Sequence, residues 1–508
     1  MRLKNIQQNV KHLKNEKIDD FTQERQLSEP SIAMGVDQED YSFIISDKVQ
    51  EELQKIVNDT NVRDIFFGRD HNDKVSSNKN QKLYIIVNNN PTEPLQMIEN
   101  FPVTYIECGT FSEKIPRNIP PQKSFPLDIK EKFDSILDDQ IGINFRSKYC
   151  NLIAISLDWK IVNREYVNKP AIVFYVIRKG IIPIGDDLLP KTIYGIDTDV
   201  REGFYEPTGI AYEYCREYTA YLASGYSIGI CNFRAGTLGA FVKNSNDKIC
   251  LLSNYHVLNS NDNSIIEHIV KQPAYMDHVG AIEEKIKETE KNLARAIDDD
   301  NNREKDRKNG KRENCYIGGK FYGVDAAIAS LELIDRNVRP KEFAIPDFAF
   351  EKYSLTVPQI SGSISIKDIK SFDTDNNIFK VGRTTGLTKG RIPELSGIDI
   401  SCDPMRNLWV YKRQLRNLGI AQMAEINDLE GRAIFQPRWL SRQILVKQTD
   451  TGSFMDEGDS GCIWFDKKGM IIALGHGVFQ NTNSVIAIGS PINAVLKALN
   501  VELYLGDN

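Results

Sequence analysis

A serine between glycines, near the C-terminal end of the sequence, constrains the fold most strongly. Residues 458–461 read Gly-Asp-Ser-Gly, between a turn-rich approach at 451–453 and an apolar run at 462–465. A serine hydroxyl is a weak nucleophile at neutral pH, so it needs a base for its proton and amide donors for the oxyanion. Glycine tolerates positive φ, which lets successive backbone N–H groups converge on one point. The motif alone occurs often by chance, so it predicts a nucleophile, Ser460, only together with a suitable histidine and aspartate.

Two titratable residues upstream lie in settings that fit these roles. His256 interrupts the apolar segment 251–258 (Leu-Leu-Ser-Asn-Tyr-His-Val-Leu), and Asp325 interrupts the apolar segment 322–329 (Tyr-Gly-Val-Asp-Ala-Ala-Ile-Ala). Such short apolar runs predict strand ends or buried turns. Burial of either group without a partner is costly, and the two would satisfy each other, because the carboxylate orients the imidazole and the imidazole accepts the serine proton. The chain order is His, Asp, Ser, which is the chymotrypsin order.

Four further segments strengthen a family resemblance that covers about residues 220–505. They are the Ala-Gly-Thr-Leu-Gly-Ala-Phe-Val segment at 235–242, the Val-Gly-Arg-Thr-Thr-Gly-Leu-Thr-Lys-Gly segment at 381–390, Gly-His-Gly at 475–477 and Ser-Pro-Ile-Asn-Ala-Val-Leu at 490–496. Together with the three motifs above, they make the chain resemble trypsin-like (chymotrypsin-fold) serine peptidases of the bacterial type. The segment 381–390 is also similar to a hairpin of the plant narrow-leaf proteases.

The resemblance implies a mainly β fold with two six-stranded antiparallel β-barrels, preceded by N-terminal α+β units. His256 and Asp325 would come from the first barrel and Ser460 from the second, and a helix around 491–499 would close the second barrel. The backbone N–H groups of Gly458 and Ser460 would form the oxyanion hole. No metal and no cofactor are expected.

The resemblance also places Gly475, His476 and Gly477 in the wall of the substrate pocket. A histidine in that wall is a feature of peptidases that cleave after Glu or Gln, where it can donate to the substrate. The alternative is a histidine on the rim that touches nothing. The partner of Asp459 is open between a backbone amine and a basic side chain. In secreted trypsins the equivalent aspartate receives the new N-terminus after zymogen cleavage, and nothing in this sequence indicates such a cleavage.

The hydrophobic pattern predicts several parts in the chain. Residues 1–125 and 126–205 are predicted as two α+β units of similar plan, with a single irregular α+β domain as an equal alternative. Residues 206–224 are predicted to form a linker, and residues 225–508 the peptidase domain. Two insertions are expected in that domain, at about 281–314 and 393–448, because the first is highly charged and the second separates the 381–390 hairpin from the nucleophile.

Composition narrows the class of protein and its compartment. A net charge of −6 argues against a nucleic-acid partner, which needs a basic stripe. The N-terminus has no apolar signal region, and no apolar run approaches the ~18 residues of a membrane span. Eight scattered cysteines without a Cys-x-x-Cys pair favour reduced thiols in the cytoplasm. The bias toward Asn, Lys and Ile suggests a bacterial source.

The predicted function is a serine endopeptidase, a hydrolase that cleaves a protein or peptide substrate through an acyl-enzyme intermediate. Residues 1–205 could regulate it, hold a homo-oligomer together or bind a regulatory partner. The alternative function is a catalytically inactive binding or scaffold protein on the same fold. An α/β-hydrolase is disfavoured, because the residue two after Ser460 is Cys462 rather than glycine and the residue order differs. The sequence also lacks the His-Glu-x-x-His of metallopeptidases and a Walker-type loop.

Overall fold

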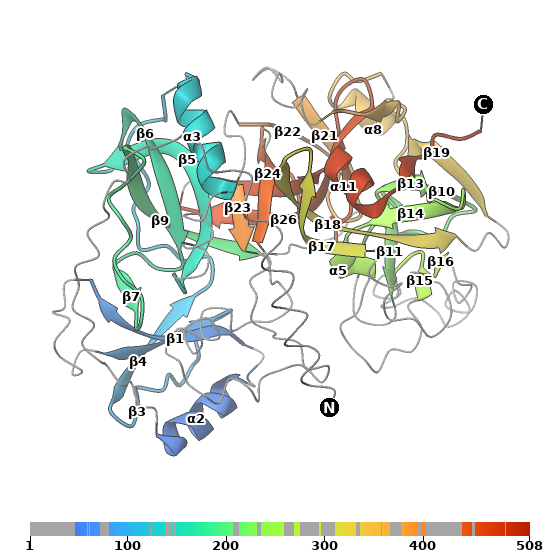
Figure 1. Cartoon of the computed structure of the whole chain (residues 1–508). Helices are drawn as coiled ribbons and strands as arrows, with labels where there is room; N and C mark the ends of the chain where they lie inside the picture. The colour runs from blue at the N-terminus through green and yellow to red at the C-terminus, as the bar shows by residue number, and fades with distance from the viewer. Residues whose placement is uncertain are drawn as a thin grey trace, which may run out of the picture. The chain divides into compact units, whose positions relative to one another are not determined.

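The computed structural model describes most of the chain from residue 46 onward (Figure 1). The described residues are 46–57, 59, 61–71, 81–121, 123–138, 145, 149–206, 213–230, 235–258, 269–274, 294–295, 310–331, 336–356, 358–365, 377–393, 398–401, 439–449, 453–482 and 484–507. Most of the two expected insertions, namely 281–293, 296–309 and 402–438, therefore lies outside the described residues.

A closed antiparallel barrel carries the nucleophile motif. Its six strands pair in ring order: β21 (Asn377–Gly382), β22 (Gly386–Arg391), β24 (Trp439–Gln448), β27 (Ser484–Pro491), β26 (Met470–Asn481) and β25 (Ile463–Phe465), which returns to β21. Apolar side chains such as Trp464, Val446 and Ile378 fill its interior, because successive residues of a strand point to opposite faces. The segment 381–390 is part of the β21–β22 hairpin, as its glycines and threonines predicted.

The other barrel of the predicted pair is a nine-stranded sheet that carries the histidine and the aspartate. Eight strands pair in the order β12 (Gly236–Thr237), β11 (Ser227–Ile230), β15 (Ile269–Lys271), β16 (Ala294–Arg295), β18 (Lys320–Leu331), β14 (Ile249–Ser253), β13 (Ala240–Lys243) and β28 (Glu502–Leu503), and β17 (Gly310–Ile317) pairs with β18. Among the described residues these pairings do not return to β12, so this sheet is a half-barrel. The predicted fold class is confirmed, with this difference in closure.

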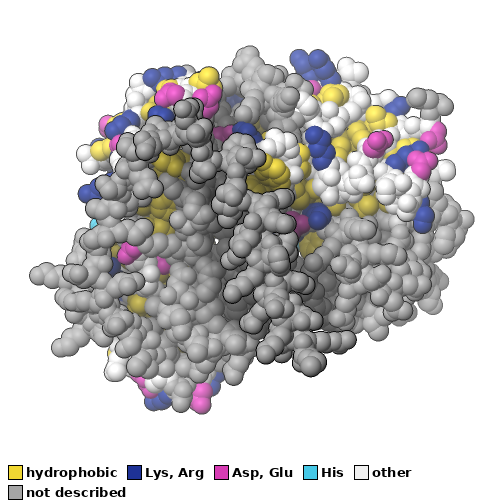
Figure 2. All heavy atoms as spheres, in the orientation of Figure 1, with side chains coloured by type: hydrophobic (Ala, Val, Ile, Leu, Met, Phe, Trp, Pro, Cys, Tyr) yellow, Lys and Arg dark blue, Asp and Glu magenta, His cyan; other side chains and the backbone are white. Residues whose placement is uncertain are grey.

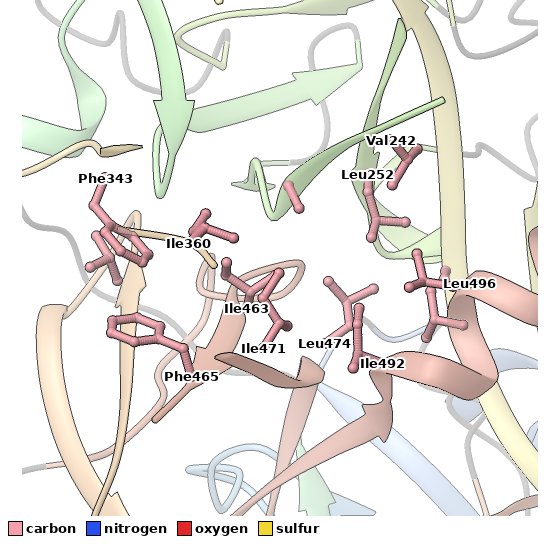
Figure 3. Packing of buried hydrophobic residues seen from close by; sticks show 14 of the residues in the cluster. Val242, Leu252, Phe343, Ile360, Ile463, Phe465, Ile471, Leu474, Ile492 and Leu496 are labelled. Atoms are coloured by element: carbon pink, nitrogen blue, oxygen red, sulfur yellow. The ribbon is translucent and has the colours of Figure 1, made fainter. Parts of the chain in front are cut away.

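An apolar cluster joins the two sheets (Figure 3). Val242 and Leu252 contribute to it from the half-barrel, and Ile463 and Leu474 contribute from the closed barrel. The C-terminal helix α11 (Ile492–Leu499) buries its apolar face in the same cluster and ends at Asn500, which is left-handed with a φ of 53°. The helix expected around 491–499 is therefore present, and its packing ties both sheets together.

The remaining elements are short or belong to the N-terminal part. They are α2 (Asp47–Val57), α3 (Leu127–Asp138), η2 (Glu213–Arg216), α5 (Tyr255–Leu258), α8 (Phe348–Glu351), β1 (Val62–Asp70), β2 (Lys82–Val87), β3 (Met97–Ile98), β4 (Phe101–Glu107), β5 (Leu152–Val162), β6 (Glu165–Val176), β7 (Ile181–Pro183), β8 (Thr192–Ile193), β9 (Ile196–Glu206), β10 (Tyr221–Ser224), β19 (Asn337–Phe343), β20 (Gly362–Ser363) and β23 (Ile398–Ser401). A five-stranded sheet has the order β3-β4-β2-β1-β7. Because β7 lies beyond residue 126, this sheet crosses the boundary expected between the two N-terminal units.

The N-terminal part shares strands with the closed barrel. β9 pairs with β26, and β5 pairs with β23, which pairs in turn with β24. The strands β5, β6, β9, β26, β27, β24 and β23 thus form a second ring, with a core that includes Tyr175, Phe479 and Leu440. Unpaired sheet edges are a liability that this closure removes. The unit expected at 126–205 therefore shares sheets with the part of the chain expected at 225–508.

The C-terminal ends of both expected insertions are strands. Residues 310–314 belong to β17, and residues 439–448 form β24, a central strand of both rings. Positive and negative side chains are interspersed over the described part of the face in Figure 2, as on an ordinary solvent-exposed surface. Among the described residues, no helix is long and apolar enough to cross a membrane.

Candidate active site

His256 and Asp325 meet where the end of β14 lies beside the middle of β18. His256 lies on α5, which follows β14 almost directly, and β14 pairs with β18, the strand of Asp325. The Nδ1 atom of His256 is 2.9 Å from Oδ2 of Asp325, and the backbone N–H of His256 donates to Oδ1 at 3.4 Å. A carboxylate at Nδ1 holds the proton there and leaves Nε2 as the acceptor. The imidazole is therefore arranged to accept a proton at Nε2.

A buried arginine supports the charge of Asp325. Arg312 on β17 is the cross-strand partner of Asp325, and its Nε atom lies 3.1 Å from Oδ2, the oxygen that also faces His256. Both side chains are almost fully buried. Burial alone would raise the pKa of Asp325, but His256 and Arg312 hold this pKa well below its usual range. The carboxylate is therefore ionised at neutral pH.

Ser460 is buried in a loop whose glycines have the backbone geometry that the motif predicted. Gly458 has a φ of 87° and Gly461 a φ of 95°, values that glycine adopts without strain. The backbone N–H of Thr237 donates to the carbonyl of Ser460 at 2.8 Å, which ties the loop to the half-barrel. The hydroxyl of Ser460 donates to the backbone carbonyl of His476 at 3.3 Å. The roles of Gly458 and Ser460 in an oxyanion hole stay a prediction.

The side chain of His476 is completely buried. Its Nε2 atom lies 2.6 Å from Oε1 of Gln443, whose amide nitrogen donates to the carbonyls of Gly323 and Ser441. These two donations turn Oε1 toward His476, so Nε2 of the imidazole carries the hydrogen. Burial lowers the pKa of His476 to about 3, against the opposing effect of Asp325. The ring is therefore neutral at physiological pH.

The side chain and the backbone of His476, a residue predicted in the pocket wall, face different partners. The imidazole of His476 faces Gln443, and its backbone carbonyl faces Ser460. Gly475 on the same strand accepts a hydrogen bond from the backbone N–H of Gly461 at 2.9 Å. The segment 475–477 thus lies beside Ser460, and its place in the wall of a substrate pocket stays a prediction. A role of His476 in substrate specificity stays a prediction.

Asp459 has a basic side chain as its partner. Its Oδ2 atom lies 2.7 Å from Nζ of Lys380, and both side chains are fully buried. The same carboxylate accepts hydrogen bonds from the backbone N–H groups of Thr384, Thr385 and Asp456. Asp459 therefore has both kinds of partner that the sequence left open, a basic side chain and backbone N–H groups.

Three residues of this site were not predicted from the sequence: Arg312, Gln443 and Lys380. Arg312 and Gln443 fall inside the two expected insertions, where polar residues are ordinary. Lys380 directly precedes the conspicuous segment 381–390, and its position beside that segment was the available signal. A lysine in an otherwise apolar strand needs a buried partner, and Asp459 was the residue without one.

Comparison with known proteins gives a resemblance in fold only. No family model and no curated protein matches the chain. Among solved structures, Thermobifida fusca protease A has 12% sequence identity, with 56% of this chain and 100% of that chain covered and a TM-score of 0.29. A Nocardiopsis protease has 11% identity over 56% and 99% of the two chains, with a TM-score of 0.29. A glutamic acid-specific serine protease has 12% identity over 56% and 100%, with a TM-score of 0.31. Because these values are low, the assignment of the fold rests on the strand pairings described above.

Proposed function

We propose that this chain is a serine endopeptidase that hydrolyses peptide bonds in a protein or peptide substrate. The observation that carries the proposal is the 2.9 Å contact between Nδ1 of His256 and the buried carboxylate of Asp325. A buried ionised carboxylate on Nδ1 is the arrangement that makes Nε2 a general base. Ser460 lies in the adjacent loop, between glycines whose positive φ values suit a nucleophile turn.

The proposed reaction proceeds in two halves. Nε2 of His256 takes the proton of Ser460 as its oxygen attacks the scissile carbonyl, and the resulting imidazolium gives that proton to the leaving amine. Water then attacks the acyl-enzyme with His256 again as the base, which releases the acid and restores Ser460. The N–H groups of Gly458 and Ser460 would stabilise the oxyanion of each tetrahedral intermediate.

The Lys380–Asp459 pair supports activity without proteolytic activation. Asp459 directly precedes Ser460, and its carboxylate is fixed by the ammonium of Lys380 and by the backbone N–H groups of 384 and 385. The nucleophile loop is therefore held by groups within the chain. The proposal includes regulation of the activity by the N-terminal region. Residues 1–205 would also hold a homo-oligomer together or bind a regulatory partner. The proposed compartment is the cytoplasm of a bacterium.

A fluorophosphonate probe tests the proposal directly, because it labels only an activated serine. We expect labelling of the full chain and its loss in Ser460→Ala and His256→Ala. Ser361→Ala is the matched control, since the hydroxyl of Ser361 donates to the carbonyl of Lys468 on the exposed surface. The control should label like the parent protein. A folded parent protein that does not label would favour the alternative, an inactive scaffold.

A further inference from the structure

The strand β26, beside Ser460, has two edges, and each is shared by two strands: β27 and β20 on one edge, and β25 and β9 on the other. β26 pairs with β27 along one edge, from Ala473 to Asn481. Residues 471–474 also pair with β25, and residues 478–481 also pair with β9. Because a strand has only two edges, β25 and β9 lie on the same edge of β26, the one opposite β27.

Very little of this edge remains between β25 and β9. The N–H of Gly475 donates to the carbonyl of Cys462 at 2.8 Å, and its carbonyl accepts from Gly461, so Gly475 is engaged by the nucleophile loop. Val478 is paired with Glu206 at the end of β9. Only His476 and Gly477 lie between, and the carbonyl of His476 faces the hydroxyl of Ser460 at 3.3 Å.

The direction of a bound peptide follows from the pairing of β26. Extended peptides bind sheets by adding a strand to an edge, and β26 is antiparallel to β25, β27 and β9 alike. A peptide that adds antiparallel with its scissile carbonyl at Ser460 runs from the carbonyl of His476 toward Val478 on its N-terminal side. That side meets β9 after about two residues.

β9 is anchored too firmly to be a displaceable strap. It pairs with β6 over residues 197–202. The carboxylate of Glu202 is fully buried and lies 3.2 Å from the guanidinium of Arg178. The rings of Tyr175 and Phe479 pack edge to face with centroids 4.8 Å apart. At Gly203 an added Cβ would lie 2.4 Å from the Phe479 ring, so backbone and ring are in close contact there.

We propose that β9 ends the substrate-binding edge of β26, so that a peptide pairs with this strand through about two residues on the N-terminal side of the scissile bond. Residues further toward the substrate's N-terminus turn away from the sheet and contribute little to recognition. The substrate class is therefore defined by the substrate residues nearest the scissile bond. This inference rests on the proposed function and adds the extent of its substrate site.

A length series on the full chain tests the inference. The probes are N-acetylated peptide 4-nitroanilides with one to five residues, in three series that end in glutamate, leucine or lysine. We expect kcat/KM to rise about tenfold or more from one residue to two, and to change less than about twofold from two to five. A further tenfold rise at the third or fourth residue, which corresponds to about 1.4 kcal/mol of transition-state binding, would overturn the inference.

A variant of β9 adds a second measurement. The fluorophosphonate probe then distinguishes failure of this inference from failure of the proposed function. Gly203→Ala brings a Cβ against the tip of the Phe479 ring, and because β6 anchors β9, the ring rather than the strand should move. The ratio of kcat/KM for four-residue and two-residue peptides should therefore stay within about twofold of the parent ratio, and a rise of about tenfold, or about 1.4 kcal/mol, would show that β9 can be displaced and would contradict the inference. If the parent protein is labelled by the fluorophosphonate and kcat/KM keeps rising with peptide length beyond two residues, the inference is refuted but the proposed function is not. Absence of labelling, with Ser460→Ala indistinguishable from the parent, would refute the proposed function and the inference together.

Discussion

Replacement of His476 by glutamine should remove a pH-dependent component from the stability of the protein. A histidine in an unfolded chain titrates near 6.5, whereas burial holds the pKa of folded His476 at about 3. Between these values the unfolded state binds more protons than the folded state. Stability that depends on neutral His476 is therefore complete above about pH 6.5 and is lost progressively as the pH falls toward 3.

The size of the effect follows from this difference. Each pH unit below the unfolded pKa costs about 1.4 kcal/mol per group, so His476 should cost roughly 2 kcal/mol at about pH 5. Glutamine does not titrate, and its amide can donate to Oε1 of Gln443 as Nε2 of the imidazole does. Asp325 titrates below this range, because its pKa is held under its usual value. The charge of Arg312 does not change.

The assay is unfolding by guanidinium chloride at pH 5, 6 and 7, followed by the fluorescence of the four tryptophans. The difference in unfolding free energy between parent and His476→Gln should change by roughly 2 kcal/mol between about pH 7 and pH 5, in favour of the variant at the lower pH. His71→Gln is the control, because His71 is exposed, and it should show no such change. A parent-to-variant difference that is equal at pH 5 and pH 7 would refute the assignment of His476 as a buried neutral imidazole.

Three further changes probe the nucleophile loop and the shared strands. Lys380→Met leaves the buried charge of Asp459 without its counter-ion and should cost about 3–5 kcal/mol of unfolding free energy; a loss below about 1 kcal/mol in denaturant titration would contradict this account. Gly461→Ala places a Cβ 2.1 Å from the hydroxyl of Ser253 at a φ of 95°, so fluorophosphonate labelling should slow by about 100-fold, the effect of a displacement near 1 Å; labelling at the parent rate would show that the loop adapts. A chain that begins at residue 207 loses β5, β6 and β9, three strands of the ring that contains β26, and should aggregate on size-exclusion chromatography; a soluble and more active fragment would instead support release from autoinhibition.

Features that local pattern determines were predictable from the sequence. The family resemblance implied a closing helix around 491–499, and α11 spans Ile492–Leu499. His256 and Asp325 were expected at strand ends or buried turns because each interrupts an apolar run; the structure places His256 on α5 just after β14 and Asp325 inside β18, with the two side chains in contact. Glycines at 458 and 461 were expected to have unusual backbone angles, and both have positive φ.

Features that depend on register between distant strands were not predictable. Arg312 reaches Asp325 because β17 and β18 pair as a hairpin, but the charged sequence before β17 resembled a surface insertion. Gln443 meets His476 only after β24 has paired with β27 and β27 with β26. The burial of His476 follows from these pairings rather than from its neighbours in the chain. A polar side chain in a strand is predicted to be exposed when the elements that cover it are not known.

The ring that joins β9 to β26 also has a consequence for synthesis of the chain. Glu206 pairs with Val478, so the ribosome must add 272 residues (478 − 206) after β9 is complete before its partner exists. At 5–20 residues per second this takes roughly 15–55 s. During that time the newly made sheet of β5, β6 and β9 presents unpaired backbone edges, which attract other strands. The N-terminal part of the nascent chain is therefore open to pairing with strands of other molecules, and slowed translation should lower the yield of folded protein.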